Sequence, residues 1–215
     1  MSLKYIDILP STSNKKPSIL IVCLHGWGSN ADDVASLFRF FQLANCQFIF
    51  PNAPFSYASS PTGKQWYNLQ PENMYDGLTE SRQLLQDFLL SLASSTGVPL
   101  SQTILSGFSQ GGAMTLDLGL KLPLAGLVSM SGYLHPGLLK QEVSNTLLKA
   151  LIMHGKQDEV VPLAAAIQAK VTLQSLGVAV EYHEFDMGHE IRPSMLKLFQ
   201  NFVISAVQET MSQNI

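Results

Sequence analysis

The sequence predicts an α/β fold in which a mainly parallel sheet of about seven strands carries helices on both faces. Short β-branched or apolar runs alternate with longer stretches of helical period, and this alternation is typical of such a sheet. Most of the short runs are apolar throughout, as strands buried on both faces are. The strand candidates are residues 5–9, 19–24, 47–50, 103–105, 126–129, 150–154 and 179–185.

The first of these candidates differs from the others. A polar segment rich in Ser, Thr, Asn and Lys separates residues 5–9 from the next strand candidate, without an intervening helical stretch. A parallel pair needs a long crossover connection, usually a helix. We therefore expect residues 5–9 to pair antiparallel, at an edge of the sheet.

The helices are predicted from apolar residues spaced three and four apart. Pro162 and Pro193 stand where two of them should begin, because the first position of a helix needs no N–H donor. Two stretches break the alternation, residues 53–76 and 133–145, and loops of this length in a compact domain are usually functional or mobile. The apolar stripes are Val34, Leu37, Phe38 and Phe41; Leu78, Leu85, Phe88 and Leu92; and Met195, Leu198, Phe199, Phe202, Val203 and Ala206.

Length and composition indicate a globular protein. At about 150 residues per domain, a chain of 215 residues predicts one domain, residues 1–215. Only 13% of the residues are charged and 46% are hydrophobic, which excludes a disordered chain. The net charge is −3 and the longest basic run is the pair Lys15–Lys16. Nucleic-acid binding usually needs a clustered basic face, so we expect no nucleic-acid partner.

The sequence shows no targeting or membrane signal. Its first ten residues lack the apolar stretch of a signal peptide, and no run approaches the roughly 18 apolar residues of a membrane span. Cys23 and Cys46 each lie in or beside an apolar strand-like run, so buried thiols are a better interpretation than a disulfide or a metal pair. We expect a cytoplasmic location and no integral membrane association, while the oligomeric state stays open.

The sharpest local motif is Gly107-Phe108-Ser109-Gln110-Gly111. A strand candidate precedes it, and residues 113–122 after it have helix-forming composition. This strand–turn–helix setting is that of a nucleophile elbow, where side chains at the two glycine positions would clash with the helix or the strand. The bare pattern is only moderately specific, and an ordinary glycine-rich connection is the alternative.

A serine hydroxyl needs a base to take its proton. His189 follows the last strand candidate, at the carboxyl end of the predicted sheet, where open α/β folds bind ligands. His183 lies inside a strand candidate, His135 has no supporting motif, and His154 is better placed to support a turn. We therefore predict that His189 is the base.

The third residue must hold the imidazole in one tautomer. Asp158 follows the strand candidate 150–154, and the order Ser109, Asp158, His189 is that of α/β-hydrolases. Glu159, one position along, is the closest rival. Asp186 is better explained as a turn-former and Asp117 as a charge on a helix surface.

The glycine-rich segment after residues 19–24 predicts an oxyanion hole. Glycines in His25-Gly26-Trp27-Gly28 let the backbone approach the site, and the N–H of Trp27 would act together with that of Gln110. A phosphate-binding loop is the competing interpretation. It is weak because no third glycine and no Lys-Ser/Thr pair stand in the required places.

Together, these segments resemble the phospholipase/carboxylesterase family, which includes the acyl-protein thioesterases. The resemblance rests on His25-Gly26-Trp27-Gly28, on Gly107 to Gly112, on His154-Gly155 before Asp158, and on Met187-Gly188-His189. It implies an α/β-hydrolase fold, with Ser109 as nucleophile, Asp158 as acid, His189 as base, and backbone donors at Trp27 and Gln110. The chain departs from the family at Trp27, often aliphatic there, and at Trp66-Tyr67-Asn68, often Trp-Phe-Asp.

The expected function is that of a serine carboxylesterase or thioesterase acting on short-to-medium acyl esters or thioesters, on a small molecule or an acylated protein. Neither loop insertion is long enough for a large cap domain, so we expect an open site. The aromatic loop 53–76 would wall an acyl groove, with Trp66 and Tyr67 as substrate-binding residues. The alternative, which is the better interpretation for any single aromatic, is that it pins the loop to the core. No cofactor and no metal are implied. A lysophospholipase, another hydrolase on the same scaffold, or a non-catalytic binding protein are the alternatives.

Overall fold

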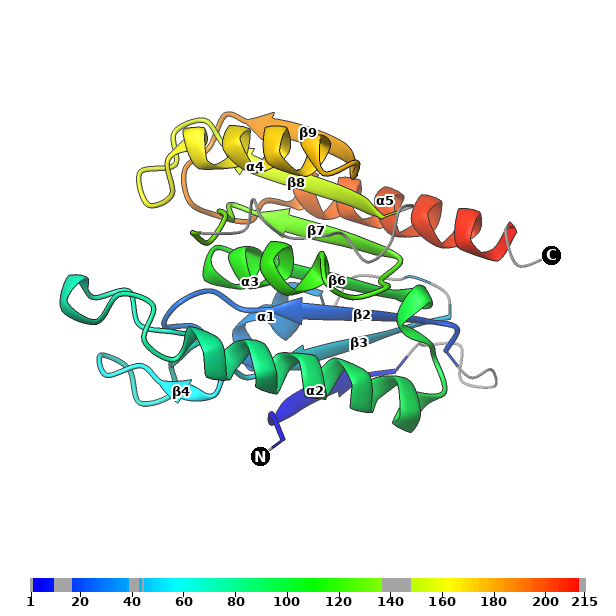
Figure 1. Cartoon of the computed structure of the whole chain (residues 1–215), viewed down its shortest axis with the longest axis horizontal. Helices are drawn as coiled ribbons and strands as arrows, with labels where there is room; N and C mark the ends of the chain where they lie inside the picture. Colours follow the sequence, from blue (N-terminus) through cyan, green and yellow to red (C-terminus); the bar gives the residue numbers. More distant parts are fainter. Residues whose placement is uncertain (1, 10–16, 39–42, 44, 137–147, 213–215) are drawn as a thin grey trace.

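Seven strands form one sheet in the order β1-β3-β2-β6-β7-β8-β9 (Figure 1). A computed structural model describes residues 2–9, 17–38, 43, 45–136 and 148–212, with the side chains of 207–212 left out. All seven predicted strands are present, with ends shifted by up to three residues. They are β1 (Tyr5–Ile8), β2 (Ile19–Leu24), β3 (Cys46–Pro51), β6 (Thr103–Phe108), β7 (Gly126–Met130), β8 (Lys149–Gly155) and β9 (Ala179–Phe185).

The edge position of the first strand is confirmed. β1 pairs antiparallel with β3, Tyr5 opposite Pro51, whereas the other neighbouring strands of this sheet pair in parallel. Because these strands run parallel, their carboxyl ends lie at one edge of the sheet, at the left in Figure 1. All six residues of β2 and of β3 are buried, as expected for central strands.

Helices cover both faces, as predicted. α2, α3 and α4 lie in front of the sheet in Figure 1, and α1 and α5 lie behind it. Pro162 caps α4 and Pro193 begins α5, as the sequence indicated. The helices are α1 (Ala31–Phe38), α2 (Leu78–Thr96), α3 (Gln110–Gly119), α4 (Leu163–Ser175) and α5 (Pro193–Ser212), with short 3₁₀ turns η1 (Pro71–Asn73) and η2 (Leu100–Gln102).

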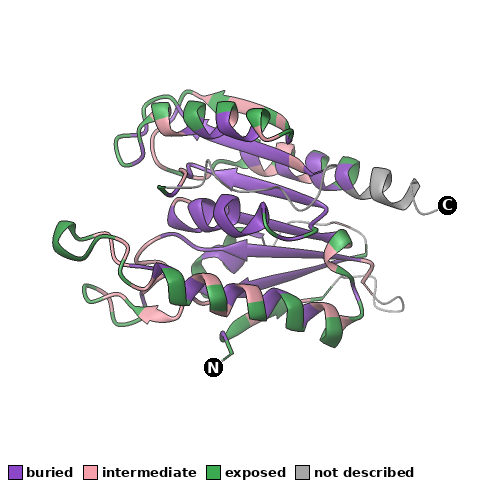
Figure 2. Ribbon diagram, in the orientation of Figure 1, coloured by how far each residue is buried: buried purple, intermediate pink, exposed green. Residues whose placement is uncertain are grey.

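The apolar stripes form two core layers, one on each face of the sheet (Figure 2). The α2 stripe is buried in full, and so is the α5 stripe except for Leu198, which is half-buried. The α1 stripe is confirmed at Val34 and Phe38 but not at every position. Leu37 is exposed, and Phe41 lies outside the described residues. Within the described part of the chain, no helix combines the length and apolarity needed to cross a membrane.

The loop 53–76 contains a small hairpin that the sequence did not predict. β4 (Phe55–Ser56) pairs antiparallel with β5 (Lys64–Gln65), and η1 follows before α2 begins. Strands of two residues are too short to show an alternation of apolar and polar residues, so the sequence pattern could not predict them. The other predicted insertion, residues 133–145, lies outside the described residues from 137 onward.

Candidate active site

Ser109 lies at a sharp turn between β6 and α3. Its backbone angles are φ 53° and ψ −118°, a conformation that is strained for a residue with a side chain. A Cβ at Gly107 would lie 2.3 Å from the carbonyl carbon of Gly111, and one at Gly111 would lie 2.4 Å from the carbonyl oxygen of Leu24. Both positions therefore require glycine, and the predicted clash with strand and helix is confirmed.

Asp158 and His189 meet although 31 residues separate them. Asp158 follows β8 and His189 follows β9, and the two strands are neighbours. The ring Nδ1–H of His189 donates to Oδ2 of Asp158 at 2.7 Å. The other carboxylate oxygen accepts the backbone N–H groups of Val160 and Val161, at 3.0 and 2.8 Å. Glu159 is exposed, so the structure brings Asp158, and not its neighbour, to the histidine.

The environment of Asp158 favours its charged form. Burial raises the pKa of this carboxyl, but the hydrogen bonds from His189 and Val161 lower it, and the net pKa lies below the usual value. A carboxylate accepts from Nδ1–H, so the neutral imidazole of His189 carries its proton on Nδ1. Its Nε2 then has a lone pair to accept a proton.

Ser109 and His189 line one pocket of about 420 Å³, which we call the Ser109 pocket. It opens at the carboxyl edge of the sheet, where loops from several strands converge, as sequence reasoning expected. Its wall is largely apolar, and Met74 and Val160 are exposed at it. The other lining residues are Trp27, Leu69, Tyr75, Tyr133, Val161, Pro162 and Ala165.

The two predicted backbone donors adjoin the nucleophile. A Cβ at Gly26 would lie 3.3 Å from the Cβ of Ser109, so the loop that carries Trp27 lies against the elbow. Gln110 is the first residue of α3, and its N–H therefore has no acceptor within the helix. The side chain of Gln110 is buried and points into the protein, where it binds the backbone N–H of Trp66 and the carbonyl of Tyr67, both at 2.8 Å.

The ring of His25 makes two buried hydrogen bonds at the glycine-rich segment. Its Nδ1–H donates to the carbonyl of Gly26 at 2.7 Å, and its Nε2 accepts the backbone N–H of Ala53 at 3.0 Å. Burial lowers the pKa of His25 to about 4, so the ring is neutral at physiological pH. His25 thus ties the segment after β2 to the loop 53–76.

Trp66 and Tyr67 do not line the Ser109 pocket, and this corrects the sequence-based prediction. Both rings are fully buried. The indole N–H of Trp66 donates to the carbonyl of His25 at 3.0 Å, and the backbone carbonyl of Trp66 accepts the hydroxyl of Ser81. The loop folds these two rings inward as supports, and its segment around Met74 supplies apolar contact at the pocket instead.

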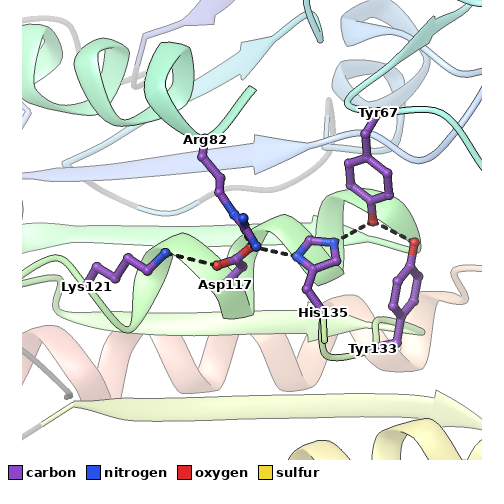
Figure 3. A network of polar contacts seen from close by, with 6 residues as sticks. All are labelled: Tyr67, Arg82, Asp117, Lys121, Tyr133 and His135. Carbon is purple, nitrogen blue, oxygen red and sulfur yellow. Dashed lines mark hydrogen bonds and ion pairs between the residues drawn. The ribbon is translucent and has the colours of Figure 1, made fainter. Parts of the chain in front are cut away.

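Asp117 is also placed differently from the prediction. It is completely buried and pairs with Arg82, Lys121 and His135. Asp117 and Lys121 are four residues apart, a spacing that is typical of ion pairs on the exposed surface of a helix, and this spacing misled the prediction. A signal was present, however, because the flanking residues of α3 are apolar or small all round, and every residue of α3 is buried. His135, which belongs to no recognisable sequence motif, is buried and contacts Asp117 (Figure 3).

The remaining histidines lie outside the pocket lining. His154 is buried, and its Nε2–H donates to the carbonyl of Val161 at 2.7 Å, so it supports the Asp158 turn as expected. His183 pairs with Glu181 on β9. Among the described residues, no three His, Cys, Asp or Glu side chains are grouped as metal ligands. Cys23 and Cys46 are buried thiols outside any disulfide, as predicted.

Comparison with known proteins gives consistent matches. A family model described as phospholipase/carboxylesterase matches residues 10–207. Acyl-protein thioesterase 1 of Saccharomyces cerevisiae is 29% identical over 210 residues, covering 85% of this chain and 90% of the yeast protein. Acyl-protein thioesterase 1 homolog 2 of Dictyostelium discoideum is 33% identical over 176 residues, covering 72% and 77%.

Solved structures agree with this match. The crystal structure of esterase PE8 aligns with a TM-score of 0.88 at 29% identity, covering 96% of this chain and 100% of that chain. A carboxylesterase of Bacillus cereus, 18% identical, shares the fold with a TM-score of 0.79 and coverage of 95% and 94%. The observed sheet order and helix layers are therefore those of the α/β-hydrolase fold.

Proposed function

The chain belongs to the phospholipase/carboxylesterase family and is a hydrolase of carboxylic esters or thioesters, and we propose that it acts through an acyl-enzyme on Ser109. One observation carries this proposal. The Asp158–His189 hydrogen bond ends in the same pocket as the strained serine of the elbow. A nucleophile, a base and a group that orients the base are the parts that acyl transfer by a serine requires.

The proposed reaction has two halves. The Oγ of Ser109 attacks the acyl carbon while the Nε2 of His189 takes the hydroxyl proton. The protonated histidine then gives that proton to the departing alcohol or thiol, which leaves the acyl group on Ser109. A water molecule attacks the acyl-enzyme with His189 again as base, and the carboxylic acid leaves. The negative charge of Asp158 stabilises the imidazolium in both halves.

The oxyanion of each tetrahedral intermediate would be held by backbone N–H groups. Gln110 is supplied by the first position of α3, and Trp27 by the loop after β2. Backbone donors fixed before the reaction starts do not have to reorient as the charge develops, and one such donor contributes about 10²–10³ in kcat. The contacts of His25 and Trp66 hold the Trp27 loop in place.

The lining of the Ser109 pocket supports short-to-medium acyl groups. Leu69, Met74 and Val160 offer apolar contact, and each buried CH₂ contributes about 0.8 kcal/mol. Because the pocket is of limited volume, this gain should level off after a few carbons. We therefore propose good turnover of 4-nitrophenyl butyrate and hexanoate, acceptance of thioesters, and little action on emulsified long-chain triglycerides.

The test is a panel of 4-nitrophenyl esters from acetate to palmitate, with one thioester and one triglyceride emulsion. A maximum in kcat/KM at short or medium chains supports the proposal, and robust triglyceride lipolysis overturns the open-pocket interpretation. The relatives named acyl-protein thioesterases make an acylated protein a candidate natural substrate. A cytoplasmic location stays a prediction.

A further inference from the structure

Ser131 lies at the carboxyl edge of the sheet, between the candidate nucleophile and the candidate acid. It directly follows β7, whose neighbours in the sheet are β6, which leads to Ser109, and β8, which leads to Asp158. The backbone N–H of Ser109 donates to the carbonyl of Met130 at 2.8 Å. The backbone N–H of Ser131 donates to the carbonyl of Met153, also at 2.8 Å. The backbone around Ser131 is therefore held on both sides by the segments that carry the site.

The backbone of Ser131 has a conformation that serine rarely adopts. Its φ is 48°, in the left-handed region that favours glycine, and the residue is fully buried. A side chain in this region costs free energy that glycine would not cost. Strained residues persist where the surrounding structure holds them, and they cluster at functional sites. The serine at this position therefore indicates a use for the hydroxyl that glycine could not supply.

The hydroxyl of Ser131 is a buried donor with its hydrogen-bonding capacity unused. Among the described residues, Oγ of Ser131 has no partner in hydrogen-bond geometry. Buried polar groups are almost always hydrogen-bonded, and one left unpaired is costly. The acceptor for this hydroxyl must lie close to the end of β7.

Asp158 has one place left for such a donor. An ionised carboxylate offers about four lone-pair sites. Oδ1 accepts from the N–H groups of Val160 and Val161, and Oδ2 accepts from Nδ1–H of His189. Burial raises the pKa of Asp158, whereas its hydrogen-bonding neighbours lower it, and the side chain of Ser131 contributes to that lowering. The hydroxyl of Ser131 therefore acts on this carboxylate, although the contact is outside ordinary hydrogen-bond geometry.

Nδ1 of His154 is the competing acceptor. It is the other buried side-chain atom without a partner in the described part of the chain. Nε2–H of His154 donates to the carbonyl of Val161, so Nδ1 can accept from a hydroxyl. A charged acceptor forms a hydrogen bond about twice as strong as a neutral one, which favours Asp158 over His154.

We propose that Ser131 is a positioning residue, whose hydroxyl donates to Oδ2 of Asp158 and holds the carboxylate in place against His189 during the reaction. This inference rests on the proposed function, in which Asp158 orients His189. Ser131 does not line the Ser109 pocket, so it acts through Asp158 and not on the substrate. Hydrogen bonds of catalytic sites are often long before the reaction and tighten in the transition state.

Two variants separate the hydroxyl of Ser131 from the shape of its turn. Ser131→Gly and Ser131→Ala both lose the donor, but only glycine adopts the left-handed φ without strain. The readout is the rate of labelling by a fluorophosphonate probe, which reacts covalently with an activated serine. A hydrogen bond to a charged group changes an equilibrium by about tenfold or more, so both variants should be labelled about tenfold more slowly. Urea denaturation should show Ser131→Gly to be the more stable of the two.

Asn45→Gly is the matched control for relief of backbone strain. Asn45 also has a positive φ, 63°, but it precedes β3 and so lies at the opposite edge of the sheet from the site. This variant should be labelled at the wild-type rate.

A double-mutant cycle with Asp158→Asn tests whether Ser131 acts through the carboxylate. Asparagine keeps one oxygen for the N–H groups of Val160 and Val161, and its NH₂ group in place of Oδ2 cannot accept a hydrogen bond. In the Asp158→Asn background, Ser131→Gly should therefore change the labelling rate by less than about twofold. An action through His154, or a purely structural role, would give the same fall in both backgrounds.

Two results would overturn the role of Ser131. One is a Ser131→Gly variant that is labelled at the wild-type rate, because the turn alone would then explain the residue. The other is an equal fall on Ser131→Gly with and without Asp158→Asn. A folded wild type that takes no label overturns the proposed function as well, so the two failures are distinguishable.

Discussion

Asp158 and Glu159 are neighbouring acids, but only Asp158 reaches the histidine of the candidate site. Asp158→Asn keeps the shape of the side chain but removes its charge, which favours the wrong tautomer of His189. We expect kcat for 4-nitrophenyl butyrate to fall about 10⁴-fold. Glu159 is exposed, and Glu159→Gln should change kcat less than about threefold. A damaging Glu159→Gln with a mild Asp158→Asn would show that the acid is misassigned by one position.

His25 gives the protein a dependence of stability on pH. Its pKa falls from the model-peptide value of 6.5 to about 4 on folding, so the unfolded chain binds this proton more tightly. The contribution of His25 is therefore complete above pH 6.5 and is lost as the pH falls toward 4. Between pH 7 and pH 5 the free energy of unfolding should drop by about 2 kcal/mol from this group.

Urea denaturation of the wild type and of His25→Gln at the two pH values measures this contribution. Gln can still accept the N–H of Ala53 but does not titrate. The variant should lack about 2 kcal/mol of the drop, while carboxylates contribute equally to both proteins. An equal drop in both proteins would contradict a buried neutral His25.

At the scale of elements, the turn between β6 and α3 depends on its glycines. Gly111→Ala would place a Cβ 2.4 Å from the carbonyl oxygen of Leu24, where only backbone movement can relieve the contact. We expect a loss of more than about 3 kcal/mol in the free energy of unfolding. Gly97→Ala is the matched control after α2. Its positive φ strains alanine by about 1–2 kcal/mol, but no atom lies within 4 Å of the new Cβ. Similar losses in the two variants, measured by urea denaturation, would argue against the close packing.

We expect two residues of the loop 53–76 to have different roles, Trp66 as a structural support and Met74 as a substrate contact. Trp66→Ala removes a fully buried ring that ties the loop to the His25 segment, so it should lower kcat/KM for acetate and hexanoate esters by similar factors. Met74 is exposed at the pocket, and Met74→Ala should lower kcat/KM several-fold for hexanoate while changing acetate little. If Trp66→Ala instead lowered kcat/KM more for hexanoate than for acetate, and Met74→Ala lowered both alike, Trp66 would be a substrate contact after all.

Trp66 and Asp117 show which features of the fold could not be predicted from the sequence. Strands, helices with a clear stripe and the elbow were predictable because period and glycine spacing are local. The direction in which Trp66 points is not local, since it depends on Gln110, which lies 44 residues away and holds its backbone. Asp117 shows the same limit. Its helical spacing from Lys121 suggested a surface pair, while burial was decided by how α3 packs on the sheet and near α2.

At the scale of the whole molecule, the parallel sheet brings the site together. β2, β6, β8 and β9 end at one edge, and the residues that follow them are those selected from the sequence as oxyanion donor, nucleophile, acid and base. Chain order alone predicted this convergence, because the carboxyl ends of parallel strands share an edge. The composition of the pocket wall could not be predicted, since Val160, Met74 and Tyr133 come from loops without a periodic pattern.

The central claim is that Ser109 is the nucleophile of a working serine hydrolase. A fluorophosphonate probe reacts covalently with an activated serine, so labelling of the folded protein, followed by mass spectrometry of the labelled peptide, tests this claim most directly. We predict one label per chain, on Ser109, and none on Ser109→Ala. Labelling of Ser109→Ala as strong as that of the wild type, or a folded wild type that takes no label, would contradict the claim.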